Sequence, residues 1–410
     1  MAVVRISGAE AARIIAALSG SLPPPRRASL RRLRDGAGDT LDRALVLWLP
    51  GPGSFTGEDG GEFFLHGGRA VLEGVAGALV AAGARPAEPG EFSRRAFLNG
   101  KLDLTEAEAV ADLVNAETAA QRRQALAQLE GGLAARLAGW AARLRLLLAG
   151  EEARIDFPEE EMPAEQQNEA AREIAALLDE MRAALAEGAR AERLRDGLVF
   201  AVAGAPNVGK SSLVNALAGA EIAIVSAIPG TTRDALETRL DLGGIPVTLI
   251  DTAGLRETDD PIEIEGVRRA HARAEAADLV LAVGCPGVPA PEAENAVLIE
   301  NKCDLGAPVP TGALPVSALT GTGMAALRAA LTEKARALTA TAGAPPLTRA
   351  RHRAALMEAA ARLQSAGEAG LPELAAEDLR LALRALGRIT GMVGVEDLLD
   401  TIFRAFCIGK

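Results

Sequence analysis

The chain contains no tyrosine and few other aromatic residues, with two tryptophans and nine phenylalanines among its 410 residues. We interpret this scarcity as a bias of composition and not as a mark of function. Its three cysteines, Cys285, Cys303 and Cys407, are widely separated. They therefore provide neither a disulfide framework nor a cysteine-rich zinc site.

Long uncharged apolar runs are also missing, because arginine and glutamate interrupt the apolar stretches before they could span a bilayer. Residues 1–20 lack the order of basic, apolar and small residues that marks a secretory signal peptide. We therefore expect a cytoplasmic protein with no membrane partner. The formal net charge of −11 argues against charge-driven binding of nucleic acid by the whole chain, although it permits a local basic patch.

The length and texture of the chain predict two or three globular domains. Residues 1–101 are rich in glycine and proline between short apolar runs, which predicts a small α+β domain. Residues 102–196 and 333–410 show helical periodicity. Residues 197–332 alternate strand-like and helical segments, the pattern of a doubly wound parallel sheet. We therefore predict a helical domain in two segments, with an α/β domain inserted between them.

The first helical segment carries two local signals. Thr105 and Glu108 resemble a capping box at its start. Pro158 and Pro163 interrupt it near the middle, because proline cannot continue a helix. We therefore expect the helical run to be broken at this point.

The most informative run is Gly-Ala-Pro-Asn-Val-Gly-Lys-Ser at residues 204–211, a complete P-loop. The apolar run 198–203 precedes it and the helical run 212–217 follows, which is the strand, loop and helix order that the motif requires. Lys210 is placed to reach the outer phosphates of a nucleotide, and the Ser211 hydroxyl to reach Mg²⁺. A glycine-rich turn without a ligand is disfavoured by the lysine, the hydroxyl and the flanking elements. The predicted phosphate-binding residues of this loop are Asn207, Val208, Gly209, Lys210, Ser211 and Ser212.

Two switch-like motifs follow the P-loop. Gly230-Thr231-Thr232-Arg233-Asp234 lies in a predicted switch loop, where Thr232 can complete the Mg²⁺ shell. The apolar strand predicted at 245–250 ends in Asp251-Thr252-Ala253-Gly254. Asp251 would hold Mg²⁺ through water, and the Gly254 N–H would contact the γ-phosphate.

Two further motifs indicate guanine. Asn301-Lys302-Cys303-Asp304 follows the apolar run 296–299, and Ser317-Ala318-Leu319 follows the short run 314–316. Asp304 can accept two hydrogen bonds from a guanine edge that adenine cannot offer, and the second motif can supply a backbone N–H to the guanine oxygen. Each motif alone is weak, but five in this order at predicted strand ends indicate a GTPase, with GTP preferred over ATP mainly because of Asp304.

The group that activates the attacking water is not obvious. Many small GTPases carry glutamine directly after the Asp-x-x-Gly motif, whereas Leu255 stands there in this chain. Leucine cannot polarise water, so another group must do so or hydrolysis must be slow. Several acidic residues follow, and for most of them a solvated surface charge is the simpler interpretation. No arginine finger is identifiable, and a monovalent cation beside the phosphates could supply its charge.

Segments outside the nucleotide motifs carry a distinctive order. They are Arg5-Ile6-Ser7-Gly8, Phe55-Thr56-Gly57-Glu58-Asp59, His66-Gly67-Gly68, the run from Pro89 to Leu104, Ile155-Asp156-Phe157-Pro158 and the C-terminal Phe406-Cys407-Ile408-Gly409-Lys410. With these segments the chain closely resembles the MnmE (also called TrmE) family of bacterial tRNA-modification GTPases over nearly its whole length.

The resemblance implies a folate-binding-like N-terminal domain at 1–101, a helical domain at 102–196 and 333–410, and a Ras-like G domain at 197–332. It implies a homodimer through the N-terminal domains and partnership with the flavoprotein MnmG (GidA). The complex would add an aminomethyl-type group to the wobble uridine of certain tRNAs, with a one-carbon unit from 5-formyltetrahydrofolate or a related folate. GTP hydrolysis would bring two G domains together across K⁺. The acidic balance of the chain indicates that the partner supplies much of the basic surface for tRNA.

The resemblance also assigns residues. It places K⁺ ligands at Asn207, at the carbonyls of Ser226 and Ile228, and at Thr231, and it gives Glu263 the task of orienting the water. The loop around the cation and nucleotide comprises Ser226, Ala227, Ile228, Pro229, Gly230, Thr231 and Thr232. The residues matched to folate contacts are Arg5, Glu62, Lys101 and Lys410.

These assignments have simpler alternatives. By composition alone, Arg5, Glu62 and Lys101 would pass as surface charges. Cys407 matches a cysteine in the tail of the family, whose chemical role we leave open, and a buried structural thiol beside two phenylalanines is its simpler interpretation.

The chain departs from the family pattern in three places, one of which is a short stretch between Val283 and Asn301. It starts almost directly at Arg5-Ile6-Ser7-Gly8, whereas the family usually has a further stretch before that motif, which bears on folate binding and on N-terminal dimerisation. Ala227 stands where an acidic residue is common. The carbonyl ligands of K⁺ do not need that side chain, so we expect the cation site to persist.

Two other functions compete with tRNA modification. A ribosome-assembly GTPase would share the P-loop and the Asp-Thr-Ala-Gly motif, but such proteins usually add a basic RNA-binding module or basic stripe, which we do not expect here. A scaffold that binds nucleotide without hydrolysis is disfavoured by Lys210, Ser211 and Glu263.

Overall fold

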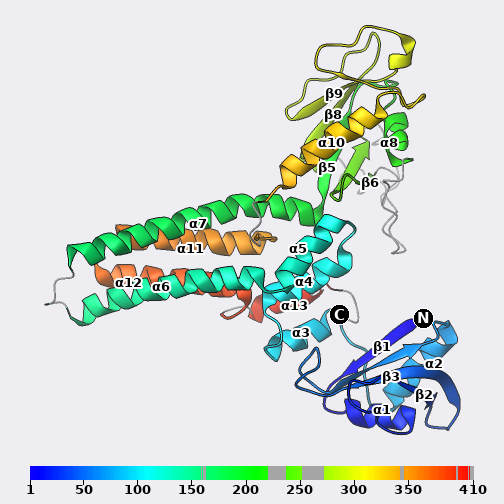
Figure 1. The fold of residues 1–410 in the computed structure, drawn as a ribbon, viewed down its shortest axis with the longest axis vertical. Coiled ribbons are helices and arrows are strands. Elements are labelled where there is room, and N and C mark those ends of the chain that lie inside the picture. Colours follow the sequence, from blue (N-terminus) through cyan, green and yellow to red (C-terminus); the bar gives the residue numbers. More distant parts are fainter. Residues whose placement is uncertain are drawn as a thin grey trace. The chain divides into compact units, whose positions relative to one another are not determined.

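The computed structural model describes residues 1–157, 159, 163–219, 237–251, 272–341, 346–393, 396–404 and 406 (Figure 1). The chain divides into two compact units. The first comprises Met1–Val114, Gln128–Met162 and Ala361–Lys410, and the second comprises Asn115–Ala127 and Pro163–Ala360. No helix in these described ranges is long and apolar enough to cross a membrane.

A four-stranded antiparallel sheet with the order β1-β4-β3-β2 begins the first unit. Its strands are β1 (Ala2–Ser7), β2 (Ser29–Arg34), β3 (Thr40–Leu49) and β4 (Gly60–Leu65). Successive side chains point to opposite faces, so one face carries the buried Leu33, Val46 and Phe63 beneath α1 (Ala11–Ser19) and α2 (Arg69–Ala81). The other face carries Leu30 paired with Leu45, and both are exposed. One face of the sheet is therefore packed against helices and the other is open at Leu30 and Leu45, and the combination of sheet and helices confirms the predicted α+β fold.

Helices make up the remainder of the first unit. They are α3 (Glu91–Leu98), α4 (Leu104–Asn115), α6 (Gly132–Asp156), α12 (Pro372–Thr390) and α13 (Glu396–Arg404). Helix α6 packs against α12, because Leu133, Leu137, Trp140 and Leu144 recur at helical spacing and are all buried. The helix ends at Asp156, close to the predicted break.

The cap of α4 corrects the sequence prediction. Asp103 Oδ1 accepts a hydrogen bond from the Glu106 N–H, and Glu106 Oε2 accepts one from the Asp103 N–H, each at 2.8 Å. The capping box is therefore formed by Asp103 and Glu106, and the predicted pair of Thr105 and Glu108 is wrong. Both of those residues are buried inside the helix. Aspartate caps as well as threonine does, and it lies earlier in the chain.

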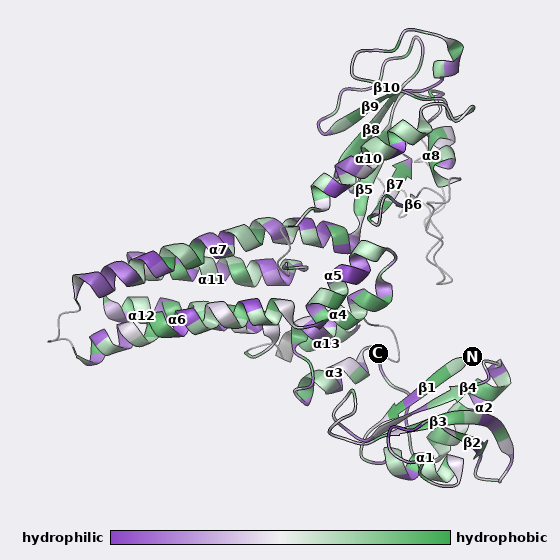
Figure 2. Ribbon diagram, in the orientation of Figure 1, coloured by the Kyte–Doolittle hydropathy of each residue, from purple (hydrophilic) through white to green (hydrophobic). Residues whose placement is uncertain are grey.

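The second unit contains a six-stranded sheet with the order β10-β9-β8-β5-β7-β6. Its strands are β5 (Leu198–Ala203), β6 (Glu237–Asp241), β7 (Pro246–Asp251), β8 (Leu279–Gly284), β9 (Ala296–Glu300) and β10 (Leu314–Pro315). All pairings are parallel except that of β6 with β7. The central strands are continuous apolar runs, drawn green in Figure 2, because both faces of a parallel sheet are covered. The predicted strands at 198–203 and 245–250 correspond to β5 and β7.

Helices α8 (Lys210–Ala218) and α10 (Met324–Thr339) share one apolar core with this sheet. Helix α10 also packs against α7 (Ala164–Asp196). Helix α10 continues through residue 332, the boundary expected for the inserted domain. A single 3-10 turn, η1 (Cys303–Leu305), follows β9. Three helices have residues in both units: α5 (Ala119–Leu129), α11 (Ala350–Glu368) and, by its last residue only, α4.

Candidate nucleotide-binding site

The P-loop leaves the end of β5 and enters α8, the order that the sequence predicts. Two glycines are required by its path. A Cβ on Gly204 would lie 2.4 Å from the Val283 carbonyl oxygen, and one on Gly209 would lie 2.4 Å from Asn301 Nδ2. Gly209 also caps α8 with a φ of 96°, which favours glycine. The loop therefore packs closely against its neighbours and presents the N-terminus of α8, where an anion is stabilised.

Lys210 and Ser211 begin α8 with their side chains held by the protein. Lys210 is 5% exposed, and its Nζ donates to the carbonyls of Gly204 at 2.7 Å and Ala205 at 2.9 Å. Ser211 Oγ donates to Asp251 Oδ2 at 2.5 Å, at the end of β7. A hydroxyl and a carboxylate in contact form a pair of hard oxygen donors, which is what Mg²⁺ prefers. The residues therefore fit a magnesium ion at this point.

Asn301 joins three loops of the site. Its Nδ2 donates to the Val208 carbonyl of the P-loop at 2.9 Å, and its Oδ1 accepts from the Ala318 N–H at 3.2 Å. The residue is only 2% exposed. Beside it, Lys302 Nζ donates to the Asn207 carbonyl at 2.8 Å. The sequence assigns both side chains to nucleotide binding, and the structure gives them the additional task of fastening the loops together.

A cavity of about 240 Å³ opens beside these loops. It is lined by Gly209, Ser212, Asn301, Lys302, Asp304, Leu305, Ser317, Ala318 and Leu319. Asp304 is exposed at its wall, and Leu319 is 88% exposed, so a carboxylate and an apolar surface are both accessible. Eight of these nine residues are predicted ligands or lie directly in the predicted motifs, and the sequence missed Leu305. A cavity lined by these groups would suit a flat nucleobase with polar edges.

Ser317 shapes the loop after β10 and does not face the cavity freely. Its N–H donates to the Thr322 carbonyl at 2.9 Å, and its Oγ accepts from the Thr320 N–H at 3.1 Å. The residue is fully buried. Ser317 therefore fixes the turn that positions Ala318 and Leu319.

Glu300, the last residue of β9, was also missed by sequence reasoning. It is buried directly before Asn301, and burial raises the pKa of its carboxyl. The sequence signal for Glu300 is a glutamate at the end of an apolar strand, and this signal can be recognised only when the boundary of the strand is known.

Several predicted site residues lie outside the described residues. They are Ser226, Ala227, Ile228, Pro229, Gly230, Thr231, Thr232, Thr252, Ala253, Gly254, Glu263, Cys407 and Lys410.

Three predicted folate contacts lie in the N-terminal domain. Arg5 and Glu62 face each other on β1 and β4 and form an ion pair at 2.7 Å. The Arg5 guanidinium also lies 5.7 Å from the Phe55 ring centroid and 5.8 Å from that of Phe92. Lys101 is exposed, and the stem of its side chain lies beside Gly57. The structure thus brings two of the three predicted residues, Arg5 and Glu62, into contact, and two aromatic rings lie near Arg5.

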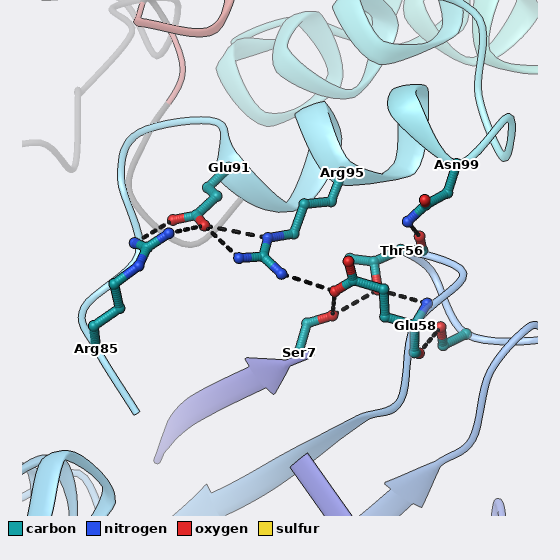
Figure 3. A network of polar contacts seen from close by, with 8 residues as sticks. Ser7, Thr56, Glu58, Arg85, Glu91, Arg95 and Asn99 are labelled. Carbon is teal, nitrogen blue, oxygen red and sulfur yellow. Dashed lines mark hydrogen bonds and ion pairs between the residues drawn. The ribbon is translucent and has the colours of Figure 1, made fainter. Parts of the chain in front are cut away.

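A polar network close to this pair was not predicted (Figure 3). Glu91 of α3 is 13% exposed and forms ion pairs with Arg85 at 2.5 Å and Arg95 at 2.8 Å. Burial alone would raise the pKa of Glu91. The hydrogen bonds from Arg85, from the Glu88 N–H and from Arg95 outweigh burial and lower the pKa to about 2.

The network continues from α3 to the first strand. Arg95 forms an ion pair with Glu58 at 2.9 Å, and the Ser7 hydroxyl lies 2.6 Å from that of Thr56 and donates to Glu58 at 3.2 Å. These contacts connect β1, the loop before β4, and α3. The residues lie in segments that the sequence marks as distinctive, but partners so far apart in the chain give no local pattern from which the pairing could be predicted.

A cavity of about 530 Å³ lies alongside β1. Most of its lining is apolar and comes from β1, α1, α2 and the segment that leads to α3, with Arg5, Glu91 and Arg95 among its polar groups. Glu62 and Lys101 are not part of the lining. The cavity is of a size that admits a small organic ligand.

Two family models match the chain. Residues 1–101 match the GTP-binding protein TrmE N-terminus, and residues 104–407 match the MnmE helical domain. A tRNA modification GTPase MnmE from Gluconacetobacter diazotrophicus is 60% identical over 417 residues, covering 100% of this chain and 96% of the relative. The protein of the same name from Granulibacter bethesdensis is 55% identical over 423 residues, covering 100% of this chain and 96% of that relative.

Solved G-domain structures are similar to part of the chain, with low TM-scores. The FeoB G-domain from Methanococcus jannaschii is 24% identical and covers 34% of this chain and 98% of its own, with a TM-score of 0.24. The G domain of the T. maritima FeoB iron transporter is 28% identical over the same shares of the two chains, with a TM-score of 0.23.

Proposed function

We propose, since this chain belongs to the MnmE (TrmE) family of tRNA modification GTPases, that it is the K⁺-activated GTPase of wobble-uridine modification. The chain is a GTPase of tRNA modification, with a TrmE-type N-terminal domain, an MnmE helical domain and an inserted P-loop G domain. Family membership favours this function over a ribosome-assembly switch and over an inactive scaffold. The finer features below are our proposal.

The nucleotide site supports GTP as the substrate. Lys210 holds its ammonium group inside the P-loop, where it neutralises charge on the outer phosphates as the bond to the γ-phosphate breaks. Ser211 and Asp251 would hold Mg²⁺, which supplies further neutralisation of phosphate charge. Asp304 selects guanine from the wall of the cavity. The observation that carries this part of the proposal is Asn301, which fixes the phosphate loop and the base-binding loop to each other.

The proposed K⁺ site and water-orienting group complete the catalytic arrangement. Asn207, Ser226, Ile228 and Thr231 supply oxygen ligands for K⁺, and Glu263 orients the attacking water. The occurrence of leucine where small GTPases carry glutamine supports this assignment, because a separate carboxylate is then needed.

The N-terminal domain is proposed to bind 5-formyltetrahydrofolate or a related one-carbon folate and to form the homodimer. Glu62 would accept hydrogen bonds from the amino-pterin edge, and Arg5, Lys101 and Lys410 would bind the carboxylates of the tail. The ion pair of Arg5 with Glu62 beside the Phe55 ring supports a site where a flat ring meets polar groups. With MnmG (GidA), the complex would add an aminomethyl-type group at C5 of the uridine. Cys407 is a candidate participant whose chemical role this proposal leaves undefined.

GTP turnover by the purified chain in KCl and in NaCl tests the proposal. We expect turnover to be faster in KCl, and Glu263→Ala to lower it by about a hundredfold, a typical effect of a group that positions or activates water. Glu265→Ala is the matched control, since it removes a carboxylate two residues away, and it should retain turnover.

Each outcome has a defined meaning. Equal rates in both salts would refute the K⁺ assignment. Normal turnover by the Glu263→Ala variant would refute the role of that carboxylate and leave the K⁺ assignment standing.

A further inference from the structure

The outer strand of the N-terminal sheet carries an unusual density of positive charge. Residues 26–43 contain six arginines and three aspartates, in a chain whose net charge is −11. Strand β2 is an edge of the sheet, and β3 is its neighbour. We name the exposed residues Arg27, Arg32, Arg34 and Arg43 the basic edge. Sequence reasoning expected no basic stripe, and the register of β2 with β3 corrects that expectation.

The register places two arginines directly opposite each other. Arg32 on β2 pairs with Arg43 on β3, and both side chains lie on the open face of the sheet, since Leu33 and Ala44 between them are buried beneath the helices. Like charges directly opposite each other destabilise an antiparallel pair. The fold therefore maintains a repulsive contact that a single neutral residue would remove.

The nearby aspartates do not neutralise this charge. Asp35 accepts hydrogen bonds from the backbone of Ala37 and Asp39, and Asp42 accepts them from the backbone and ring of His66. Within the described residues, none of the six arginines of this segment forms an ion pair. Arg34 donates only to the Gly38 carbonyl in the turn that follows β2. The guanidinium groups of the basic edge are therefore accessible to an external anion.

We propose that the basic edge binds the sugar–phosphate backbone of tRNA. This inference rests on the proposed function, in which tRNA is the substrate. Arginines two apart on a strand are separated by about 7 Å, so Arg32 and Arg34 can contact successive parts of a polyanion while Arg43 widens the surface. Such contacts orient RNA without reading its sequence, which suits an enzyme that serves several tRNAs. We expect the affinity to be modest, because the net charge of the chain is −11.

One physical alternative is a defence against aggregation. Charged side chains on an edge strand prevent it from pairing with the edge of another sheet. That role predicts self-association, and no change in tRNA binding, when the charges are removed. Arg43 lies on the inner strand β3, where this defence is not needed, so the Arg32 and Arg43 pair favours an external anion.

The test compares two double variants of the full chain. Arg32→Gln with Arg43→Gln removes two charges from the open face. The matched control, Arg13→Gln with Arg69→Gln, removes two charges from α1 and α2 on the other face, where each arginine pairs with a glutamate on its own helix or beside it. Binding of an unmodified tRNA transcript with uridine at the wobble position is measured by fluorescence anisotropy over a range of KCl concentrations.

We expect the open-face variant to bind about tenfold more weakly at low salt and to lower the salt slope by about 2, one for each lost phosphate contact. Its melting temperature should stay the same or rise, because the repulsive pair is gone. The control should bind as the wild type does. The proposal would be overturned if the open-face variant bound tRNA as the wild type does, or if the control lost as much affinity. It would also be overturned if the open-face variant self-associated without losing affinity for tRNA, or if the wild-type chain did not bind tRNA.

The proposed tRNA contact can be tested separately from the proposed K⁺-activated GTPase. Neither variant touches the nucleotide site, so GTP turnover in KCl should match that of the wild type in both. Failure of the K⁺ test with an intact tRNA effect would leave the basic edge supported.

Discussion

The nucleotide domain and the N-terminal domain build their sites in different ways. In the six-stranded sheet, the described site residues lie at or just after the ends of β5, β7, β9 and β10, and most of their contacts are to backbone atoms of neighbouring loops. In the antiparallel sheet, the polar groups are long side chains paired across large separations, such as Arg5 with Glu62 and Glu58 with Arg95. The first kind of site depends on local sequence at strand ends, and the second depends on tertiary pairing.

Asp304 offers the strongest test of the first kind of site, because its effect should not depend on any distant partner. We expect Asp304→Asn to weaken GTP binding by about 10²–10³-fold, since hydrogen bonds from the base to a carboxylate are lost. The same variant should bind xanthosine triphosphate better than the wild type, because the asparagine amide can donate to the additional carbonyl of xanthine. Competition against a fluorescent nucleotide measures both affinities.

Asp304→Ala is the control for this selectivity. It removes the accepting carboxylate without supplying an amide donor, so it should bind both nucleotides weakly. Equal preference of the Asp304→Asn variant and the wild type for GTP would mean that the base is recognised elsewhere.

Glu91 tests the second kind of site. Its pKa falls from 4.5 to about 2 on folding, so its interactions stabilise the folded domain above pH 4.5, and that contribution is lost as the pH falls towards 2. We expect Glu91→Gln to lower the free energy of unfolding by on the order of 3 kcal/mol at neutral pH, and by progressively less below pH 4.5. Urea unfolding followed by Trp48 fluorescence measures this in a Trp140→Phe background, where Trp48 is the sole tryptophan.

The control is Glu88→Gln, which removes an exposed carboxylate three residues earlier. It should change stability little at any pH. If the Glu91→Gln variant lost the same free energy of unfolding at neutral pH and at pH values well below 4.5, the effect would arise from packing and not from the charge.

Leu319 gives the smallest effect and refines the description of the cavity proposed to hold guanine. It is 88% exposed, so Leu319→Ala should leave the melting temperature unchanged. Loss of its apolar contact with a bound base should weaken GDP binding by about fivefold, or about 1 kcal/mol. Val309→Ala, an exposed apolar residue that does not line the cavity, should bind GDP normally. Identical affinities in the two variants would remove Leu319 from the binding surface.

The contrast between the two domains explains what could be predicted from the sequence. The strands that carry the P-loop and Asp251 were predicted nearly to the residue, because buried parallel strands are continuous apolar runs that end at functional loops. The polar network around Glu91 and the pairing of Arg32 with Arg43 were not, since they depend on register and on helix placement. The cap at Asp103 was misplaced because two overlapping patterns both satisfy the rule for a capping box.

The hydrogen bonds of Asn301 also bear on nucleotide exchange. They join the phosphate loop to the base loop through protein atoms alone, so the loss of backbone entropy in these loops accompanies folding and not ligand binding. A preorganised pocket of this kind can release GDP and take up GTP without first being rebuilt. The contact between these two loops is thus independent of the nucleotide and can persist while GDP leaves and GTP enters.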